Sequence, residues 1–397
     1  MKIALLGFGT VGSGVYEILQ EKKQAGLQDL FVTRALVKEI NSGMPDFATE
    51  NFADIANDDQ INTVVEMMGG LHPAYEFLKA SIEKGKNAVT SNKLLVSVYG
   101  EELNALAKSK GTAFLFSAAC GGGIPYLSNL QRAKRSDTIQ EVGGILNGTT
   151  NFMLDAMQRH NMSFAAALKE AQKMGYAEAD PSSDVDGLDT MRKCILSSAV
   201  GFDLLVNEES IVTEGIGSID SVDIEFYQNN GWVCRLITHA GRTEKGIYAY
   251  VEPTCFGPTE LEVGVTENKN IAWFKSEYEG KMSFYGQGAG KFPTAANVIM
   301  DLLDITDGKK HMLNDTCVRV NADNQLILHR YAVRVDKETV CEELNSITEK
   351  QTIIGSWKFH VTKVVSVESM HTLARRLNEK NTFVFFTGIA EEEESHA

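Results

Sequence analysis

Residues 175–194, GYAEADPSSDVDGLDTMRKC, place five carboxylates just before a pair of basic side chains. Such a run could be a solvated loop, a metal site or a catalytic surface. Asp184 and Asp186 match the third and fifth positions of an EF-hand calcium loop, but Lys193 then stands where a bidentate glutamate is needed. No histidine or cysteine lies at zinc-ligand spacing in this run. Metal binding by these side chains is therefore disfavoured.

Acid–base chemistry is the stronger interpretation of the same segment. Asp189 and Lys193 are four residues apart in a predicted helix over residues 187–202, so they share one face. A surface ion pair would show the same spacing and would stabilise the protein little. A lysine whose pKa is tuned by burial and by a carboxylate can instead move a proton. The remaining carboxylates would suit a substrate with an amino group: Glu178, Asp180 and Asp184.

A glycine motif at the start of the chain predicts a cofactor site. The stretch GFGTVG is a GxGxxG pattern that directly follows an apolar strand at residues 2–6 and opens a helix. In this context the glycines permit a tight turn, close approach of a pyrophosphate, and close helix–strand packing. The motif consists of Gly7, Phe8, Gly9, Thr10, Val11 and Gly12.

The choice between NAD and NADP depends on the end of the second strand. Lys38 is the first charge after the strand predicted over residues 31–37 and favours the 2′-phosphate of NADP, whereas Glu39 keeps NAD open. We favour NADP. A second candidate active-site ammonium is Lys93, in NAVTSNK at the carboxyl end of a later strand, where open α/β sheets bind ligands.

The elements that position these residues alternate between strand and helix up to about Pro125. This alternation predicts an N-terminal Rossmann-like, doubly wound parallel sheet. Residues 213–284 favour mostly strands, as expected for an antiparallel sheet in a second domain of α+β type. The segment from about His329 predicts a small separate α+β module, followed by a charged, mobile end at 391–397.

Composition limits the possible partners. The 397 residues carry a net charge of −15 without a basic run, which argues against nucleic acid. No apolar stretch approaches the length of a membrane span, and residues 1–12 are not typical of a signal peptide. The six cysteines show no CxxC or secreted-scaffold spacing. We therefore expect a cytoplasmic protein with a small-molecule substrate.

These motifs together resemble those of the homoserine dehydrogenases over about residues 1–315. The resemblance is carried by GFGTVG, VVEMMGG, VTSNK, GGGIPYL, ILNGTTNFML, GYAEADPSSDVDGLDTMRK and GAGKFPTAANVIMDLL. It implies reversible, NAD(P)-linked conversion of L-homoserine to L-aspartate 4-semialdehyde, in the biosynthesis of threonine, methionine and isoleucine. It also implies a dinucleotide-binding domain over 1–130, completed by about 288–315, and a catalytic and dimerisation domain over 131–287.

The resemblance assigns roles to particular residues. Lys193 would be the general acid/base, Asp189 would pair with it or with substrate, and Lys93 would lie between nicotinamide and substrate. Further substrate-binding residues would be Glu178, Asp184 and Thr149, and further cofactor-binding residues would be Thr90, Ser91 and Gly288. The backbone carbonyls of the SAACGGGIP segment would hold a sodium ion, with ligands from Ser117, Cys120, Gly122 and Ile124.

The C-terminal module, residues 325–397, resembles an ACT regulatory domain incompletely. Many homoserine dehydrogenases carry one for threonine feedback, with a glycine-containing loop after its first strand. Here that loop reads VDKETVCEEL, without glycine, so a structural or oligomerising role is an equal alternative. We expect a homodimer or homotetramer, because the sheet of the second domain has few helices to cover it.

Two other functions compete with this hypothesis. One is a dehydrogenase of another amino-acid semialdehyde or amino alcohol. The other is a catalytically silent dinucleotide sensor with the C-terminal module as its output. A silent protein would have no need for the ionisable residues singled out above, which are Lys93, Glu178, Asp189 and Lys193.

Overall fold

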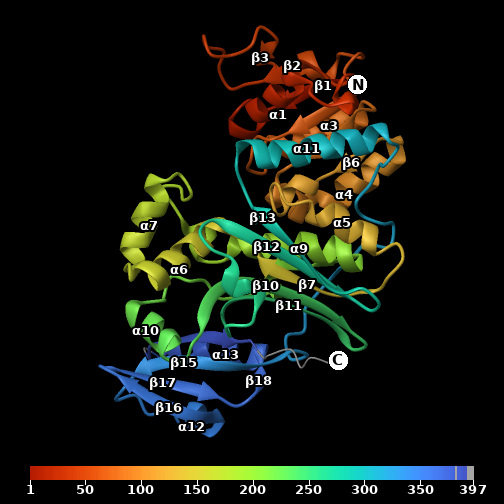
Figure 1. Ribbon diagram of the computed structural model, residues 1–397. Coiled ribbons are helices and arrows are strands. Elements are labelled where there is room, and N and C mark those ends of the chain that lie inside the picture. The colour runs from red at the N-terminus through yellow and green to blue at the C-terminus, as the bar shows by residue number, and fades with distance from the viewer. Residues whose placement is uncertain (381, 391–397) are drawn as a thin grey trace. The chain divides into compact units, whose positions relative to one another are not determined.

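The computed structural model describes residues 1–380 and 382–390 (Figure 1). The contacts within it divide the chain into two compact units. Unit 1 contains residues 1–139, 195–205 and 284–319, and unit 2 contains residues 140–194, 206–283 and 320–397. The acidic end at 391–397, predicted to be mobile, lies outside the described residues. No helix in the described part of the chain combines the length and apolar character that crossing a bilayer requires.

Unit 1 is built on a six-stranded sheet in the order β3-β2-β1-β4-β5-β6, and every paired neighbour is parallel. Its strands are β1 (Lys2–Leu6), β2 (Phe31–Leu36), β3 (Ala48–Thr49), β4 (Thr63–Glu66), β5 (Asn87–Thr90) and β6 (Phe114–Leu115). This order is that of dinucleotide-binding folds, in which ligands bind outside the carboxyl ends of the strands. The predicted Rossmann-like sheet is confirmed.

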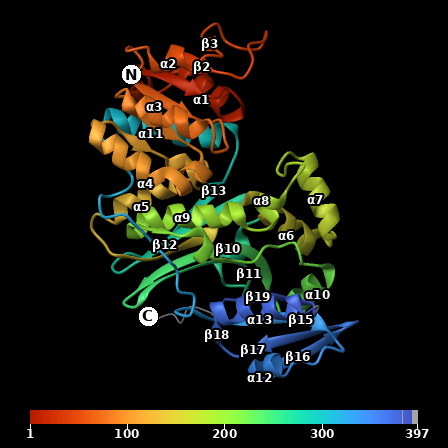
Figure 2. The ribbon, with the colours of Figure 1, turned by 180° about the vertical axis from the view of Figure 1, so that it is seen from behind.

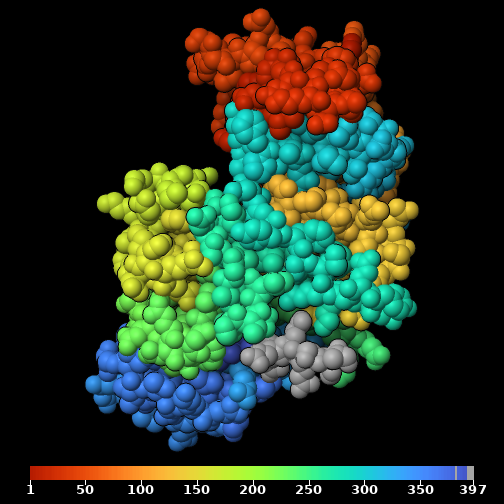
Figure 3. All heavy atoms as spheres, viewed as in Figure 1, coloured from red at the N-terminus to blue at the C-terminus, as the bar shows by residue number. Residues whose placement is uncertain are grey.

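Helices flank this sheet: α1 (Thr10–Glu21), α2 (Ala53–Ala56), α3 (Ala74–Glu83), α4 (Lys93–Lys110), α5 (Tyr126–Ala133) and α11 (Lys291–Thr306). Helix α11 packs against α1, and Figure 3 shows it in cyan at the surface of this unit, next to the red N-terminal segment. Helix α4 begins at Lys93, which the sequence placed only at the carboxyl end of a strand. The Asn92 side chain caps it by accepting from the backbone N–H of Leu95.

Unit 2 contains most of a larger mixed sheet in the order β13-β12-β7-β10-β11-β19-β15-β17-β16. The strands of its first part are β7 (Ile139–Ile145), β10 (Val233–Thr243), β11 (Gly246–Phe256), β12 (Lys269–Ser276) and β13 (Gly280–Gln287). Its helices are α6 (Gly148–His160), α7 (Phe164–Lys173), α8 (Ser182–Val185) and α10 (Ser221–Asn229). Helix α6 packs on β10 and β12, as the rear view in Figure 2 shows. Helix α9 (Leu188–Phe202) begins in unit 2 and continues in unit 1.

The C-terminal module has the order strand, helix, three strands, helix, strand. It consists of β15 (Leu328–Asp336), α12 (Glu342–Ile347), β16 (Thr348–Ile354), β17 (Trp357–Thr362), β18 (Val365–Ser366), α13 (Val367–Glu379) and β19 (Val384–Ile389). Strand β16 was not predicted. Its residues are mostly polar and exposed, so its sequence lacks the alternation of apolar and polar residues that is typical of a strand. Two-residue β9 (Val212–Thr213) pairs with β11, and β8 (Leu204–Val206) pairs with β14 (Val318–Val320).

The module shares its sheet with the rest of unit 2. Strand β19 pairs in parallel with β11, where Thr254 lies opposite Gly388. Buried side chains of the module, such as Tyr331 and Phe386, belong to the same apolar cluster as Tyr250 of β11. This common core explains why the contacts group the predicted third domain with unit 2.

Candidate active site

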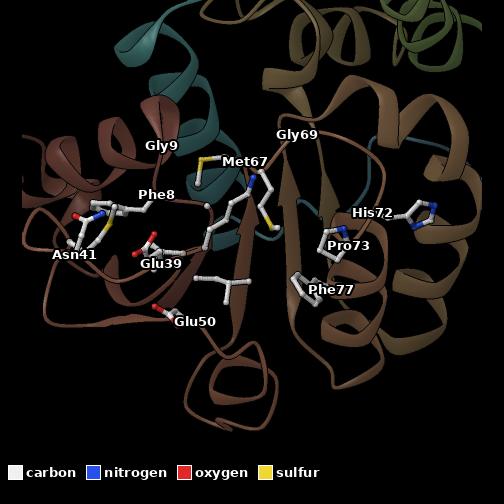
Figure 4. A pocket seen from close by; sticks show the side chains of 16 residues that line it. Phe8, Gly9, Glu39, Asn41, Glu50, Met67, Gly69, His72, Pro73 and Phe77 are labelled. Carbon is white, nitrogen blue, oxygen red and sulfur yellow. The ribbon is translucent and has the colours of Figure 1, made fainter.

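A pocket of about 730 Å³ lies at the carboxyl ends of β1, β2 and β4 in unit 1. Figure 4 shows Glu39, Asn41 and Glu50 on its β2 side, and Pro73 and Phe77 on its other side. Four of the predicted cofactor residues line it: Gly7, Phe8, Gly9 and Lys38. The pocket therefore lies where the strand order predicts a dinucleotide.

The glycine loop has the geometry that this role requires. Gly7 has φ +103°, a conformation that favours glycine. A Cβ on Gly12 would lie 2.2 Å from the carbonyl oxygen of Gly7, so helix α1 could not pack here with a larger residue. A Cβ on Gly9 would meet nothing within 4 Å, which leaves the backbone open to a ligand at the N-terminus of α1.

The other predicted cofactor residues belong to unit 1 as well but do not line this pocket. Thr10, Val11 and Gly12 form the first turn of α1. Thr90 ends β5, and Ser91 connects it to Lys93, the first residue of α4. Gly288 precedes α11, where its carbonyl oxygen would lie 2.4 Å from a Cβ on Gly122.

Two carboxylates accompany Lys38 in the pocket. Glu39 follows it directly, and Glu50 lies after β3. The Glu50 carboxylate accepts a hydrogen bond of 2.7 Å from the backbone N–H of Ile40, so it is fixed beside the segment that follows β2. Glu50 could not be identified from local sequence patterns, because its place in the pocket depends on the pairing of β2 with β3.

A buried glutamate organises the loop after β4. Glu66 accepts a hydrogen bond of 2.7 Å from Met68 N–H and one of 2.5 Å from the Thr90 hydroxyl. The Asn92 side chain donates to the Gly70 carbonyl at 2.6 Å. Burial raises the pKa of Glu66, although its hydrogen bonds oppose that effect. Glu66 lies within the quoted VVEMMGG block but was given no role from sequence.

In unit 2, Lys193 and Asp189 form the ion pair that their spacing predicts. The Lys193 ammonium lies 2.7 Å from Asp189 Oδ2 and donates to the Leu146 carbonyl at 2.5 Å. The exposed fractions are only 8% for Lys193 and 5% for Asp189. The pair is therefore not the exposed surface ion pair considered above.

Asn147 joins this pair to the rest of the acidic segment. Its side-chain amide donates to Asp189 Oδ2 at 2.9 Å and to Asp184 Oδ1 at 2.7 Å. Its oxygen accepts from Thr150 N–H at 2.8 Å and caps α6. Burial, and next the charge of Asp189, raise the pKa of Asp184. Asn147 belongs to the ILNGTTNFML motif, but the motif alone does not indicate these partners.

The remaining predicted substrate residues lie in the same unit. The Thr149 hydroxyl donates to the Tyr176 carbonyl at 2.7 Å and so fastens the start of the acidic segment to α6. The Glu178 side chain is exposed, and its backbone carbonyl accepts from Gln172 at 3.1 Å. Lys93 belongs to unit 1, so its approach to Lys193 stays a prediction.

The predicted sodium ligands lie on the segment between β6 and α5 in unit 1, at the edge of the sheet expected for ligands. Two of the four carbonyls, those of Gly122 and Ile124, accept hydrogen bonds from the Asn297 side chain. Over residues 1–380 and 382–390, no group of three or more His, Cys, Asp or Glu side chains is arranged to hold a metal.

The parallel sheet with its glycine loop and the buried lysine–aspartate pair define an NAD(P)-dependent oxidoreductase. Residues 7–117 match the family model "Homoserine dehydrogenase, NAD binding domain", and residues 125–303 match the model "Homoserine dehydrogenase". The chain belongs to the homoserine dehydrogenase family, as its motifs predicted.

Relatives and solved structures agree with this assignment. The homoserine dehydrogenase of Bacillus subtilis is 36% identical over 77% of this chain and 72% of its own length. That of Synechocystis is 37% identical over 77% of this chain and 73% of its own length. The crystal structure of a homoserine dehydrogenase from Thiobacillus denitrificans superposes with a TM-score of 0.88 at 29% identity, over 98% of both chains.

Proposed function

We propose that this chain interconverts L-homoserine and L-aspartate 4-semialdehyde with Lys193 as its general acid/base. Oxidation of the alcohol removes a hydride from carbon and a proton from oxygen, and the aldehyde remains. A nicotinamide cofactor, when bound, would supply the hydride acceptor. Lys193 takes the proton in its neutral amine form, directly or through one water, and becomes the ammonium that returns the proton in the reverse reaction.

The observation that carries this proposal is the fixed position of the Lys193 head group. Asp189 and the Leu146 carbonyl both bind it, and Asn147 holds the aspartate in place from the other side. A buried lysine held by a carboxylate is well placed to exchange a proton with a substrate hydroxyl. Asp184 and Glu178 would bind the substrate ammonium, and Lys93 would polarise the carbonyl that forms.

Substitution of Lys193 by alanine tests the acid/base role. We expect kcat for homoserine oxidation to fall about 10²–10⁴-fold, the usual contribution of a general acid/base. Absorbance at 340 nm follows the reaction with each cofactor. Turnover within about tenfold of the unaltered protein would refute the role.

The matched control is Lys173→Ala. Lys173 also pairs with an acidic residue on its own helix, at 3.1 Å from Glu170, but its side chain is exposed. We expect its removal to leave kcat unchanged. The oxidation of other amino alcohols in the same assay separates homoserine dehydrogenase activity from the related alternatives.

We further propose that NADP is the preferred cofactor, with Lys38 binding the 2′-phosphate. The support is chemical: Lys38 lines the pocket next to the end of β2, where the ribose is expected. Glu39 and Glu50 line it as well, and their charge would favour the 2′-hydroxyl of NAD. Because Lys38 favours NADP and the two glutamates favour NAD, the ratio of the activities with the two cofactors tests the proposal.

A further inference from the structure

Helix α11 fastens the segment between β6 and α5 with two buried polar side chains. Asn297 is 4% exposed and Asp301 is 0% exposed, and they are four residues apart on one face. The Asn297 amide donates to the Gly122 carbonyl at 2.9 Å and to the Ile124 carbonyl at 3.3 Å. Asp301 Oδ2 accepts from Ser117 N–H at 2.8 Å, so α11 contacts both ends of the segment.

The acceptors of Asn297 determine how its amide is turned. Both partners are carbonyl oxygens, so the NH₂ group must face them, because the side-chain oxygen would be repelled. The Ile124 carbonyl also accepts from Tyr126 N–H at 2.7 Å. A carbonyl oxygen has two lone pairs, and these two donors occupy both. A cation that used the Ile124 oxygen would have to displace one of them.

We propose that in this chain the Asn297 amide takes the place of the sodium ion expected from the family resemblance. A hard cation would draw the carbonyl oxygens of Gly122 and Ile124 together. One NH₂ group with two N–H donors binds the same two oxygens. The donor set therefore fits an internal amide better than a bound ion, and the segment keeps its conformation without sodium.

The position of this segment matters for the rest of unit 1. Gly122 has φ +52°, and a Cβ there would lie 2.4 Å from the Gly288 carbonyl oxygen. Gly123 N–H donates to the Gln287 carbonyl at 3.1 Å. The two backbone segments thus pack without side chains between them. Asn297 thereby acts as a positioning residue for Gly288, which is a predicted cofactor residue.

Thermal unfolding in two salts tests the proposal without any assay of activity. The full chain is compared in sodium chloride and in tetramethylammonium chloride at equal ionic strength, since the organic cation is too large to bind carbonyl oxygens at this spacing. We expect the unaltered protein to have the same Tm in both salts. Asn297→Ala should lose about 2–4 °C in tetramethylammonium chloride and regain most of it in sodium chloride.

The matched control is Asn104→Ala. Asn104 is another buried asparagine of unit 1, and its amide donates to the Leu313 carbonyl at 3.3 Å and not to Gly122 or Ile124. Its loss should lower Tm equally in both salts. If Asn297→Ala does not fold, Asn297→Ser, which retains a single donor, replaces it in the same comparison.

Three results would overturn the proposal. The first is a sodium-dependent rise in Tm for the unaltered protein, or broadening of the sodium NMR line by it. The second is an Asn297 variant as stable as the unaltered protein in both salts. The third is a variant that sodium does not rescue. None of these depends on the proposed dehydrogenase activity, so failure of one proposal leaves the other intact.

Discussion

Asn147 is the residue on which the geometry of the acidic segment depends. Its amide bridges Asp184 and Asp189, while its oxygen caps α6. Without the bridge, two neighbouring carboxylates would repel each other, and Asp189 would be free to turn away from Lys193. We therefore expect Asn147 to be a positioning residue for the proposed acid/base pair of Lys193 and Asp189.

Two substitutions separate the roles of Asn147. Asn147→Ala removes both cap and bridge, and we expect a loss of about 1 kcal/mol in stability from the cap together with a fall in kcat of about tenfold or more. Asn147→Ser retains a capping oxygen but cannot reach both carboxylates. It should keep the stability and still lose activity, with an altered pH profile of kcat.

The matched control for the cap is Ser163→Ala at the start of α7, where the Ser163 hydroxyl accepts from Ala166 N–H at 3.3 Å. We expect it to lower stability without changing the pH profile. Full activity of Asn147→Ser would show that the bridge does not position Lys193.

At the scale of elements, we expect the end of β2 to set the cofactor preference. The segment after β2 presents Lys38 and Glu39, and Glu50 holds it through Ile40. We expect Lys38→Ala to lower kcat/KM for NADP about tenfold while leaving that for NAD nearly unchanged, because only the 2′-phosphate loses a partner. Glu50→Gln keeps an acceptor for Ile40 and removes a charge, so it should shift the ratio toward NADP.

Initial rates with both cofactors measure this preference. Lys84→Ala is the control, since Lys84 is an exposed lysine of the same unit outside the pocket. If Lys38→Ala lowered kcat/KM equally with NAD and NADP, Lys38 would support the fold of the pocket and would not bind the 2′-phosphate.

At the scale of the whole molecule, a buried charge cluster fastens the C-terminal module to the sheet of unit 2. Glu252 on β11 is 0% exposed and lies 3.0 Å from His371 Nε2 on α13 and 3.5 Å from His329 Nδ1 on β15. Burial favours the neutral acid, but the two imidazoles outweigh it, so the pKa of Glu252 is lowered. The charged carboxylate thus stabilises the attachment of the module.

Removal of this charge should loosen the module. We expect Glu252→Gln to cost about 1–3 kcal/mol, as for the loss of a buried hydrogen bond to a charged group, and to speed hydrogen exchange in α13 and β19. A lowered carboxyl pKa stabilises the fold above the unfolded value of about 4.3, and that stability is lost as pH falls through the folded value. The difference in the free energy of unfolding between the two proteins should therefore be largest at neutral pH and shrink below about pH 4.

An exposed pair in the same module provides the control. Glu349 lies 3.2 Å from Arg330 at the surface, and Glu349→Gln should cost less than about 1 kcal/mol. Exchange rates in α13 that do not change in Glu252→Gln would contradict a fastening role. Self-association and the ACT-like character of the module stay predictions.

The sequence by itself determined the features that depend on neighbours along the chain. The glycine spacing placed the turn between β1 and α1, and helical periodicity placed Asp189 and Lys193 on one face of α9. The family motifs indicated the homoserine dehydrogenase activity. The sequence also contains the cap of α4, because Asn92 stands just before Lys93 and the apolar run 94–96, but we did not predict a helix start there.

Only the tertiary structure decided which distant residues meet. Asn147 reaches Asp184 and Asp189 across 37 and 42 residues, and Asn297 reaches the Gly122 carbonyl across 175. The pairing of β19 with β11 likewise made the predicted third domain part of unit 2. Local patterns carry no information about such contacts, because a buried polar group takes whichever partner the packing of the whole chain brings within hydrogen-bond distance.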